Sequence, residues 1–256
     1  MQNKRFQFFW IVAIISGCNK EKFFKGPNFF QDSFETYVTL SELLKSESHL
    51  WSLTQLTKDK NNIVIDSNQA YSGRKSIRFF AESSDQDGAS KASIVKQHMA
   101  FWEGDTVRMS ANYYIDGNSK LDWLFLMDLE EQTAIGAGPG MRLAMVDNEL
   151  RIEYKFDEKD ITQPKGTEVK FPRNQWVSLV WEVTLSQKNL GSVRLWQDGQ
   201  IIIQCENKRT LPKDVLYFQQ GTKGMYSSCE IGITANSKDN PLILWVDDVR
   251  FEKVNP

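Results

Sequence analysis

The chain has 256 residues, of which 41% are hydrophobic and 25% are charged. Its 31 lysine and arginine residues nearly balance its 33 aspartate and glutamate residues, so the formal net charge is −2 at pH 7. This balance argues against a nucleic-acid partner and against a generally basic surface. The length suits one domain with a sizeable core, and the sequence shows no repeat or linker.

The first 17 residues have the pattern of a signal peptide. Two basic residues precede the apolar run Phe6 to Ile15, which is shorter than the roughly 20 residues of a membrane-spanning helix. The following Ile15-Ser16-Gly17-Cys18 resembles the lipobox of bacterial lipoproteins. We therefore expect a lipid anchor on Cys18, a polar tether over residues 18–31, and a location in the bacterial cell envelope at the outer membrane. The alternative is an ordinary cleaved signal with an incidental cysteine.

Residues 32–256 are predicted to form one all-β domain. Thr39 to Glu42 has the pattern of a capping box before a short helix. Period-two alternation and turn residues then predict about a dozen short strands. These strands are expected at residues 63–65, 76–80, 92–98, 106–115, 123–129, 141–146, 149–156, 176–185, 192–197, 200–204, 215–220, 230–234 and 242–252.

The stretch from Phe171 to Gln204 carries the clearest pattern. One face of its first strand is apolar, formed by Val177, Leu179, Trp181, Val183 and Leu185. Asp198-Gly199 supplies the positive-φ residues of a two-residue hairpin between the next two strands. A meander with one apolar face needs a second layer, so the pattern predicts a two-sheet jelly-roll sandwich.

The order of these segments resembles a known family. The segments that carry the resemblance are Asp32 to Glu35, Trp51, the Ser72-Gly73 turn, Gly104-Asp105, Pro139-Gly140, Phe171 to Trp176, Trp196 to Gly199 and Trp245 to Val249. Together they resemble concanavalin A-like (lectin/glucanase type) jelly rolls, especially the heparin lyase I-like polysaccharide lyases. The resemblance implies that the domain handles an extracellular polysaccharide in a groove on the concave sheet.

Cleavage of a uronic-acid chain by β-elimination needs a group that neutralises the sugar carboxylate, a base and an acid. Lys96 and His98 lie two residues apart on a predicted strand, and we expect both to line the groove as catalytic residues, with His98 as the candidate base. The alternative for His98 is a structural or surface histidine. Arg142 is expected beside these two residues, because its neighbours Met141 and Leu143 take the inward face. Two cations and a histidine would favour an acidic sugar.

The run from Tyr217 to Tyr226 resembles the tyrosine-containing strand of jelly-roll lyases. The resemblance implies that Tyr226 is the proton donor, with Lys223 nearby. By alternation, Tyr217 and Gln219 share one face and are expected to line the groove.

One feature departs from the family. Such lyases carry a Gln-x-His motif on a central strand, but the corresponding stretch Leu124 to Glu130 has neither residue. Asp128 and Glu130 could form a glycosidase-like carboxylate pair there, although a solvated strand edge is the favoured interpretation. Catalysis therefore stays open, and the alternative is a carbohydrate-binding or structural lipoprotein without turnover. Trp196 is the leading candidate for stacking on a sugar, with Trp102 and Trp123 as further candidates.

Two further expectations concern ligands and cysteines. Asp247 shares its parity with Ile243, Trp245, Val249 and Phe251, and a carboxylate among apolar groups needs a partner. The family resemblance implies calcium between the first and last strands, so Glu35 and Asp247 are candidate ligands with carbonyls near Gly73. The alternative is a hydrogen-bonded Asp247. Cys205 and Cys229 could form a disulfide or remain as free thiols.

Overall fold

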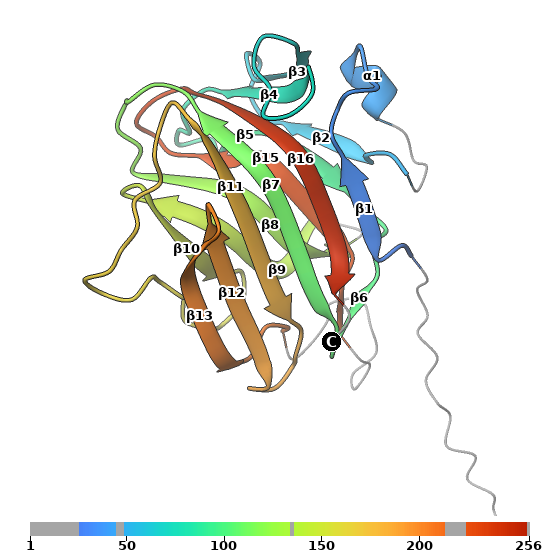
Figure 1. Ribbon diagram of the computed structural model, residues 1–256, viewed down its shortest axis with the longest axis vertical. Helices are drawn as coiled ribbons and strands as arrows, with labels where there is room; N and C mark the ends of the chain where they lie inside the picture. Colours follow the sequence, from blue (N-terminus) through green and yellow to red (C-terminus); the bar gives the residue numbers. More distant parts are fainter. Residues whose placement is uncertain (1–25, 45–48, 134–135, 213–223, 255–256) are drawn as a thin grey trace, which may run out of the picture.

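The computed structural model describes residues 26–44, 49–133, 136–212 and 224–254, which form a sandwich of two antiparallel sheets (Figure 1). The eight-stranded sheet contains β13 (Gln200–Lys208), β12 (Gly191–Gln197), β11 (Trp176–Thr184), β7 (Thr106–Ile115), β16 (Leu242–Val254), β4 (Ser76–Ala81) and β3 (Asn62–Asp66) in this order, and β1 (Phe29–Asp32) also pairs with β16. The all-β, jelly-roll prediction is confirmed.

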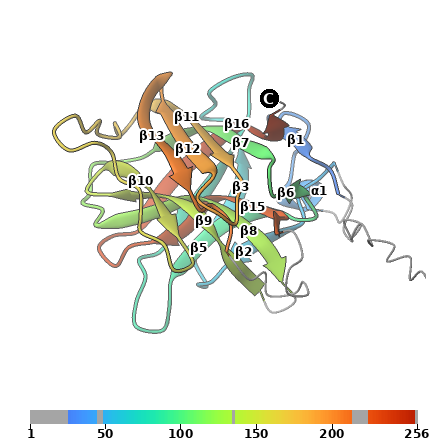
Figure 2. The same ribbon diagram turned by 90° about the horizontal axis from the view of Figure 1, so that it is seen from below.

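The six-stranded sheet forms the second layer. Its order is β10 (Glu149–Tyr154), β9 (Gly136–Val146), β8 (Trp123–Thr133), β15 (Ser228–Asn236), β5 (Ser90–Lys96) and β2 (Leu53–Leu56). Seen from below, β11, β12 and β13 lie on one side of the molecule and β8, β9 and β5 on the other (Figure 2). The pair β6 (Phe101–Trp102) and β14 (Met225–Tyr226) and the helix α1 (Leu40–Leu43) complete the described elements.

The hydrophobic core lies between the two sheets, as the alternation in Phe171 to Gln204 predicted. All five alternating apolar residues of β11 and its end, Val177 to Leu185, are buried in this core. The hairpin between β12 and β13 turns at Asp198 and Gly199, whose φ angles are 50° and 77°. These positive values are those of the two-residue turns that match the twist of the strands.

The first strand is held by one buried side chain. Phe30 on β1 pairs with Phe251 on β16, and its ring packs 5.0 Å from Trp51 and 5.8 Å from Phe251, measured between ring centroids. Such aromatic pairs contribute roughly 0.5–1.5 kcal/mol beyond their buried area. The aromatic contacts therefore fasten β1 to the sandwich.

Strand β16 contains a bulge that changes which side chains face the core. Leu244 and Val246 point inward before the bulge, and Val249 points inward after it. The pairing with β7 shifts between Asp247 and Arg250, and Asp248 has a φ of 49°. The predicted common face for Ile243, Trp245, Asp247, Val249 and Phe251 is therefore wrong, because an extra residue in a strand inverts the alternation beyond it.

Two other properties bear on the sequence predictions. Cys205 on β13 and Cys229 on β15 are free thiols, so the open question of a disulfide is answered in favour of two thiols. In the part of the chain that the structure describes, no helix has the length and apolar character needed to cross a membrane.

Candidate functional site

The outer face of the six-stranded sheet carries charged side chains on its interior strands. On β15, Cys229 and Ile231 lie in the core, so Glu230 between them points outward. In the strand register Glu230 lies opposite Asp128 on β8, which lies opposite Arg142 on β9. We call this surface the polar face, and it comprises Gln55, Lys91, Ser93, Asp128, Glu130, Arg142, Lys155 and Glu230.

Asp128 is the centre of an ionic cluster on the polar face. Its Oδ1 lies 3.2 Å from Lys155 Nζ and 3.4 Å from Arg142 Nε, and Lys155 also pairs with Glu130. The Asp128 side chain is 4% exposed. Burial acts to raise its pKa, but Lys155 and Arg142 outweigh burial and hold the pKa below its ordinary value. The carboxylate is therefore ionised at neutral pH.

The pKa of Glu230, which lies two strands away from Arg142, is shifted in the opposite direction from that of Asp128. The Ser93 hydroxyl donates to Glu230 Oε1, Gln55 Nε2 donates to Oε2 at 3.0 Å, and Lys91 Nζ lies 4.0 Å from Oε1. Burial and the nearby Asp128 carboxylate raise the pKa of Glu230 to about 7, against the smaller effect of Lys91. Glu230 therefore gains and loses its proton near neutrality.

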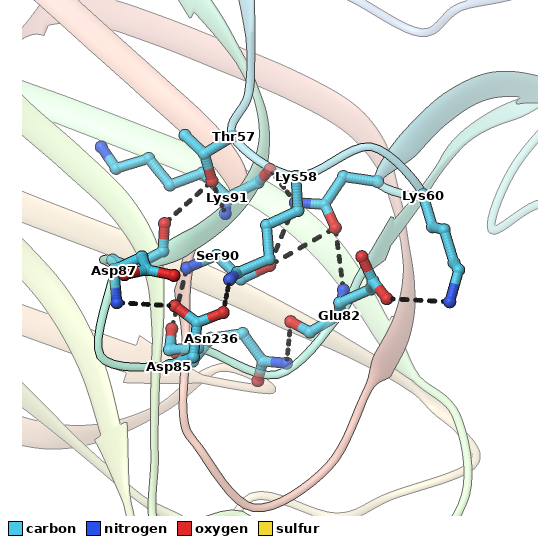
Figure 3. Close-up of polar contacts among 12 residues, drawn as sticks. Thr57, Lys58, Lys60, Glu82, Asp85, Asp87, Ser90, Lys91 and Asn236 are labelled. Atoms are coloured by element: carbon cyan, nitrogen blue, oxygen red, sulfur yellow. Dashed lines mark hydrogen bonds and ion pairs between the residues drawn. The ribbon is translucent and has the colours of Figure 1, made fainter.

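A polar network fixes the start of β5 and thereby places Lys91 (Figure 3). The Lys91 backbone N–H donates to Thr57 Oγ1 at 2.8 Å, and its carbonyl accepts from Asn61 Nδ2 at 2.6 Å. An ion pair between Lys58 and Asp85 ties the preceding loop to the same region. From this fixed backbone Lys91 Nζ reaches Gln55 Oε1 at 3.0 Å.

An aromatic pair borders the polar face on β8. The rings of Trp123 and Phe125 lie 4.8 Å apart, and the Arg142 guanidinium carbon lies 4.2 Å from the Phe125 ring centroid. Both aromatic side chains are partly exposed. A guanidinium fixed between a ring and a carboxylate suits recognition of a sugar acid, since rings stack on sugars and guanidinium groups bind carboxylates.

Arg142 has the outward orientation that was predicted, but it does not lie beside Lys96, which is buried on β5. Arg142 points away from the core residues Met141 and Leu143, onto the polar face. Trp123, a further stacking candidate, lies at the same face, whereas Trp102 is 4% exposed and packs against Ala100 and Met225.

Lys96 does not lie on the polar face, so its predicted place in a groove is wrong. It shares its parity with Ala92 and Ile94, which are core residues. The Lys96 amine donates to the Leu50 carbonyl and lies 4.9 Å from the Phe30 ring centroid. Burial lowers the pKa of Lys96, as expected for a cation that is 1% exposed.

His98 does not share a strand face with Lys96, as had been predicted. Strand β5 ends at Lys96. His98 lies in the bend beyond it, is exposed and has a φ of 63°. Alternation cannot be extended through a residue in the left-handed region.

Tyr226 lies in the core and does not line an open groove, contrary to the predicted placement. Its side chain is 0% exposed, and its hydroxyl donates to the Thr210 carbonyl at 2.8 Å. Burial raises its pKa well above the ordinary tyrosine value. In this arrangement the hydroxyl has a structural hydrogen bond, and proton donation to a substrate stays a prediction from the resemblance.

Trp196 lies on β12, in the other sheet, and so is remote from Arg142. It lines a shallow hollow of about 330 Å³ with Arg108, Val180 and Gly199. The remaining predicted residues, Tyr217, Gln219, Lys223 and Cys18, lie outside the described residues.

Glu35 and Asp247 meet at one turn, residues 71–75. Glu35 Oε1 accepts the backbone N–H groups of Arg74 and Lys75, each at 2.8 Å. Asp247 Oδ2 accepts those of Tyr71 and Ser72 at 2.9 and 3.1 Å. Burial raises the pKa of Asp247 to about 6.

The Glu35 carboxylate lies so close to Gly73 that a Cβ there would be 2.4 Å from its Oε1. Carboxylate oxygens are of the kind that calcium binds, but in this arrangement Glu35 and Asp247 accept backbone N–H groups, which is the hydrogen-bonded alternative considered for Asp247. The described residues contain no group of three or more Asp, Glu, His or Cys side chains placed to hold a metal. Calcium would therefore need carbonyl oxygens as well, and it stays a prediction.

Four residues of the polar face were not predicted from the sequence: Glu230, Lys155, Lys91 and Gln55. The signal for Glu230 was available, because Cys229 and Ile231 alternate with it. The interpretation of Asp128 and Glu130 as a solvated strand edge is wrong, since β8 lies between β9 and β15 and both side chains are buried. The partners from β2, β5 and the segment after β10 depend on strand order, which alternation does not reveal.

Comparisons with known proteins give one family and several solved structures. Residues 45–250 match the family model described as "Polysaccharide lyase". The fold is similar to an endo-beta-1,4-glucuronan lyase from the fungus Trichoderma reesei (TM-score 0.64, 14% identity, 80% of this chain and 91% of that chain). It is also similar to the cellulose induced protein Cip1 (0.61, 11%, 88% and 97%) and to alginate lyase Aly36B (0.58, 8%, 90% and 99%). No sequence among the curated proteins matches.

Proposed function

This chain belongs to the polysaccharide lyase family, and from that premise we propose that it cleaves a uronic-acid-containing polysaccharide by β-elimination at the polar face. Two proteins with the same fold, a glucuronan lyase and an alginate lyase, act on polyuronates, and this similarity supports the substrate class. In the reaction a base removes the C5 proton, the C4–O bond breaks, and the leaving oxygen takes up a proton.

The observation that carries the proposal is the fixed guanidinium of Arg142. Its stacking on Phe125 and its contact with Asp128 hold it on the outer face of the sheet. A sugar carboxylate bound there would be neutralised, which makes the neighbouring C5 proton more acidic. Trp123, stacked with Phe125, would support the sugar ring.

Proton transfer at neutral pH needs a group that titrates there. On the polar face Glu230 meets this condition, because its pKa is raised to about 7. We assign Glu230 to proton exchange at this face through its contacts with Ser93 and Gln55.

The test is a panel of neutral and uronic-acid polysaccharides, with absorbance of the unsaturated product and binding followed in parallel. Arg142→Ala should lower turnover of a polyuronate about 10²-fold or more, as for loss of a group that stabilises developing charge. Arg194→Ala, which removes a guanidinium from the other sheet, is the matched control. No unsaturated product from any polyuronate with the wild-type protein would contradict the proposal.

A second candidate function is polysaccharide binding without turnover, and the burial of Tyr226 favours it. A lyase that uses Tyr226 as its proton donor should lose turnover about 10²–10⁴-fold in Tyr226→Phe while retaining its ligand. A lyase that relies on the polar face alone would keep its turnover in this variant. A binding protein would show ligand retention and no product in either form.

We also propose that Cys18 carries a lipid anchor that holds the protein at the bacterial outer membrane. The lipobox-like Ile15 to Cys18 supports it, and acyl chains would make the protein peripheral to the membrane. Mass spectrometry of the mature protein should find acylated Cys18 at its N-terminus. An unmodified N-terminus at another residue would contradict the anchor.

We also propose that a calcium ion binds at the turn formed by residues 71–75. Glu35 and Asp247 would hold it, and the ion would neutralise the two carboxylates. We expect chelation to lower the melting temperature of the wild-type protein and to have a smaller effect on Glu35→Gln. Equal melting temperatures with and without chelator, together with no calcium by elemental analysis, would contradict the site.

A further inference from the structure

A row of aromatic side chains crosses the outer face of the eight-stranded sheet. Trp176 on β11 lies opposite Tyr114 on β7, which lies opposite Trp245 on β16, which lies opposite Arg78 on β4. Tyr71, from the turn between β3 and β4, packs on Trp176 with a centroid distance of 5.8 Å. We call Tyr71, Trp176, Tyr114 and Trp245 the aromatic strip.

The aromatic strip does not belong to the core. The neighbours of its members, such as Val177, Tyr113 and Leu244, point into the core instead. Tyr71 is 51% exposed, and the other three side chains are partly exposed. Large aromatic groups gathered on a solvent-facing surface indicate a binding site, because single exposed apolar residues are common but contiguous ones are not.

The rings are held in place before any ligand binds. Neighbouring centroids are 5.8 Å apart for Tyr114 and Trp176 and 5.5 Å apart for Tyr114 and Trp245, in edge-to-face geometry. The Trp245 indole N–H donates to Asp66 Oδ2 at 2.8 Å. A fixed ring loses little conformational entropy on binding, which favours affinity.

The Arg78 side chain lies at one end of the aromatic strip, opposite Trp245. The Arg78 guanidinium carbon lies 5.8 Å from the Trp245 ring centroid, and Nη1 donates to Asn62 Oδ1 at 3.4 Å. The Asp66 carboxylate that holds Trp245 also interacts electrostatically with Arg78. Rings that stack on sugars, next to a guanidinium that binds carboxylates, complement an acidic glycan. The polar face lies on the other sheet, so this surface is separate from Arg142.

We propose that the aromatic strip is a second glycan-binding surface, which holds a polyuronate chain without cleaving it. The choice of glycan rests on the proposed function, since an enzyme that acts on a polymer gains from a second attachment to it. When one polymer is attached at two places, its effective concentration at the polar face rises. The aromatic strip would thus increase action on long chains and leave short oligosaccharides unaffected.

The experiment is affinity electrophoresis in gels that contain alginate or glucuronan, using the full chain with Arg142→Ala to disable the polar face. We expect this variant to be retarded in at least one gel. Adding Trp176→Ala should weaken the apparent Kd about tenfold, which corresponds to about 1.4 kcal/mol. Adding Phe29→Ala instead, which removes a 46% exposed aromatic side chain on β1 of the same sheet but outside the strip, should leave retardation unchanged.

Tyr71→Ala and Arg78→Gln supply variants at a turn and at a polar position if Trp176→Ala fails to fold. The same loss of retardation is expected in both. Absence of retardation with Arg142→Ala alone, or equal retardation with and without the strip substitutions, would overturn the proposal. Failure of the proposed function is read separately, as absence of unsaturated product with the wild-type protein.

Discussion

The outer faces of the two sheets use the same charged groups in different surroundings. On the eight-stranded sheet, Glu182 pairs with Arg108 at 2.8 Å and with Arg194 at 3.2 Å, and Arg194 also reaches Glu206 at 2.8 Å. The Glu182 side chain is 10% exposed, but its partners Arg108 and Arg194 are 38% and 35% exposed and Glu206 is 51% exposed. On the six-stranded sheet Asp128 is 4% exposed, and its partners Arg142 and Lys155 are 19% and 16% exposed.

Solvent-exposed ion pairs lose little hydration and contribute little to stability. Buried ion pairs lose much of their hydration, and the attraction between the charges offsets this desolvation cost only in part. A hydrophobic surface would cover the six-stranded sheet at lower cost. Asp128, Glu130 and Glu230 therefore carry a larger desolvation cost than the carboxylates of exposed pairs, in keeping with the site proposed at the polar face. The contrast between the two faces is one of solvent access to the ion pairs.

The largest expected effect is that of Asp128→Ala. Removal of this carboxylate leaves Lys155 and Arg142 with less compensation in a buried setting, so we expect a loss of about 3–5 kcal/mol in the free energy of unfolding. Urea unfolding measures it. A loss below about 1 kcal/mol would place Asp128 with the exposed pairs and remove the contrast between the two faces.

A smaller effect is expected from Glu230→Gln, which should change how the free energy of unfolding depends on pH. The pKa of Glu230 is about 7 in the folded protein against an ordinary value of 4.5, so the folded state binds its proton more tightly. Its contribution to stability is fully present below pH 4.5 and is lost as the pH rises to about 7.

The slope from Glu230 approaches about 1.4 kcal/mol per pH unit within this window. Chemical unfolding at several pH values should show a flatter profile for Glu230→Gln than for the wild-type protein. Glu206→Gln is the exposed control and should keep the wild-type slope. Parallel profiles for Glu230→Gln and the wild-type protein would contradict the raised pKa.

The smallest effect is expected from Glu206→Gln on stability itself. Both members of its pair with Arg194 are substantially exposed, so the loss should be about 1 kcal/mol or less and should fade as salt is added. Thermal melting at low and high salt measures it. A loss that salt does not reduce would show that this face is not governed by solvent screening.

The fold could be predicted because local patterns specify it. Val177 to Leu185 alternate, and the turns Asp198-Gly199 and Asp147-Asn148 have the positive φ angles that their residue types favour. The outward orientation of Arg142 could be predicted for the same reason. These features depend only on neighbours along the chain.

The candidate site could not be predicted to the same extent, because it depends on strand order and on irregular backbone. The bulge at Asp247 and the bend at His98 both interrupt alternation. The partners of Glu230 come from β2 and β5, and the sequence does not state that these strands lie beside β15. Lys96 is a different case, since its parity with Ile94 already indicated the core.

The attachment of β1 has a mechanical consequence. The described chain enters the sandwich through this strand, whose four residues pair with β16 and whose Phe30 ring is buried against Trp51 and Phe251. A pull on the N-terminal segment would first load the hydrogen bond from the Ala100 N–H to the Pro27 carbonyl, at 2.9 Å, and then this short ladder and the Phe30 ring. The buried Phe30 side chain would thus transmit tension on the N-terminal segment to the core of the domain.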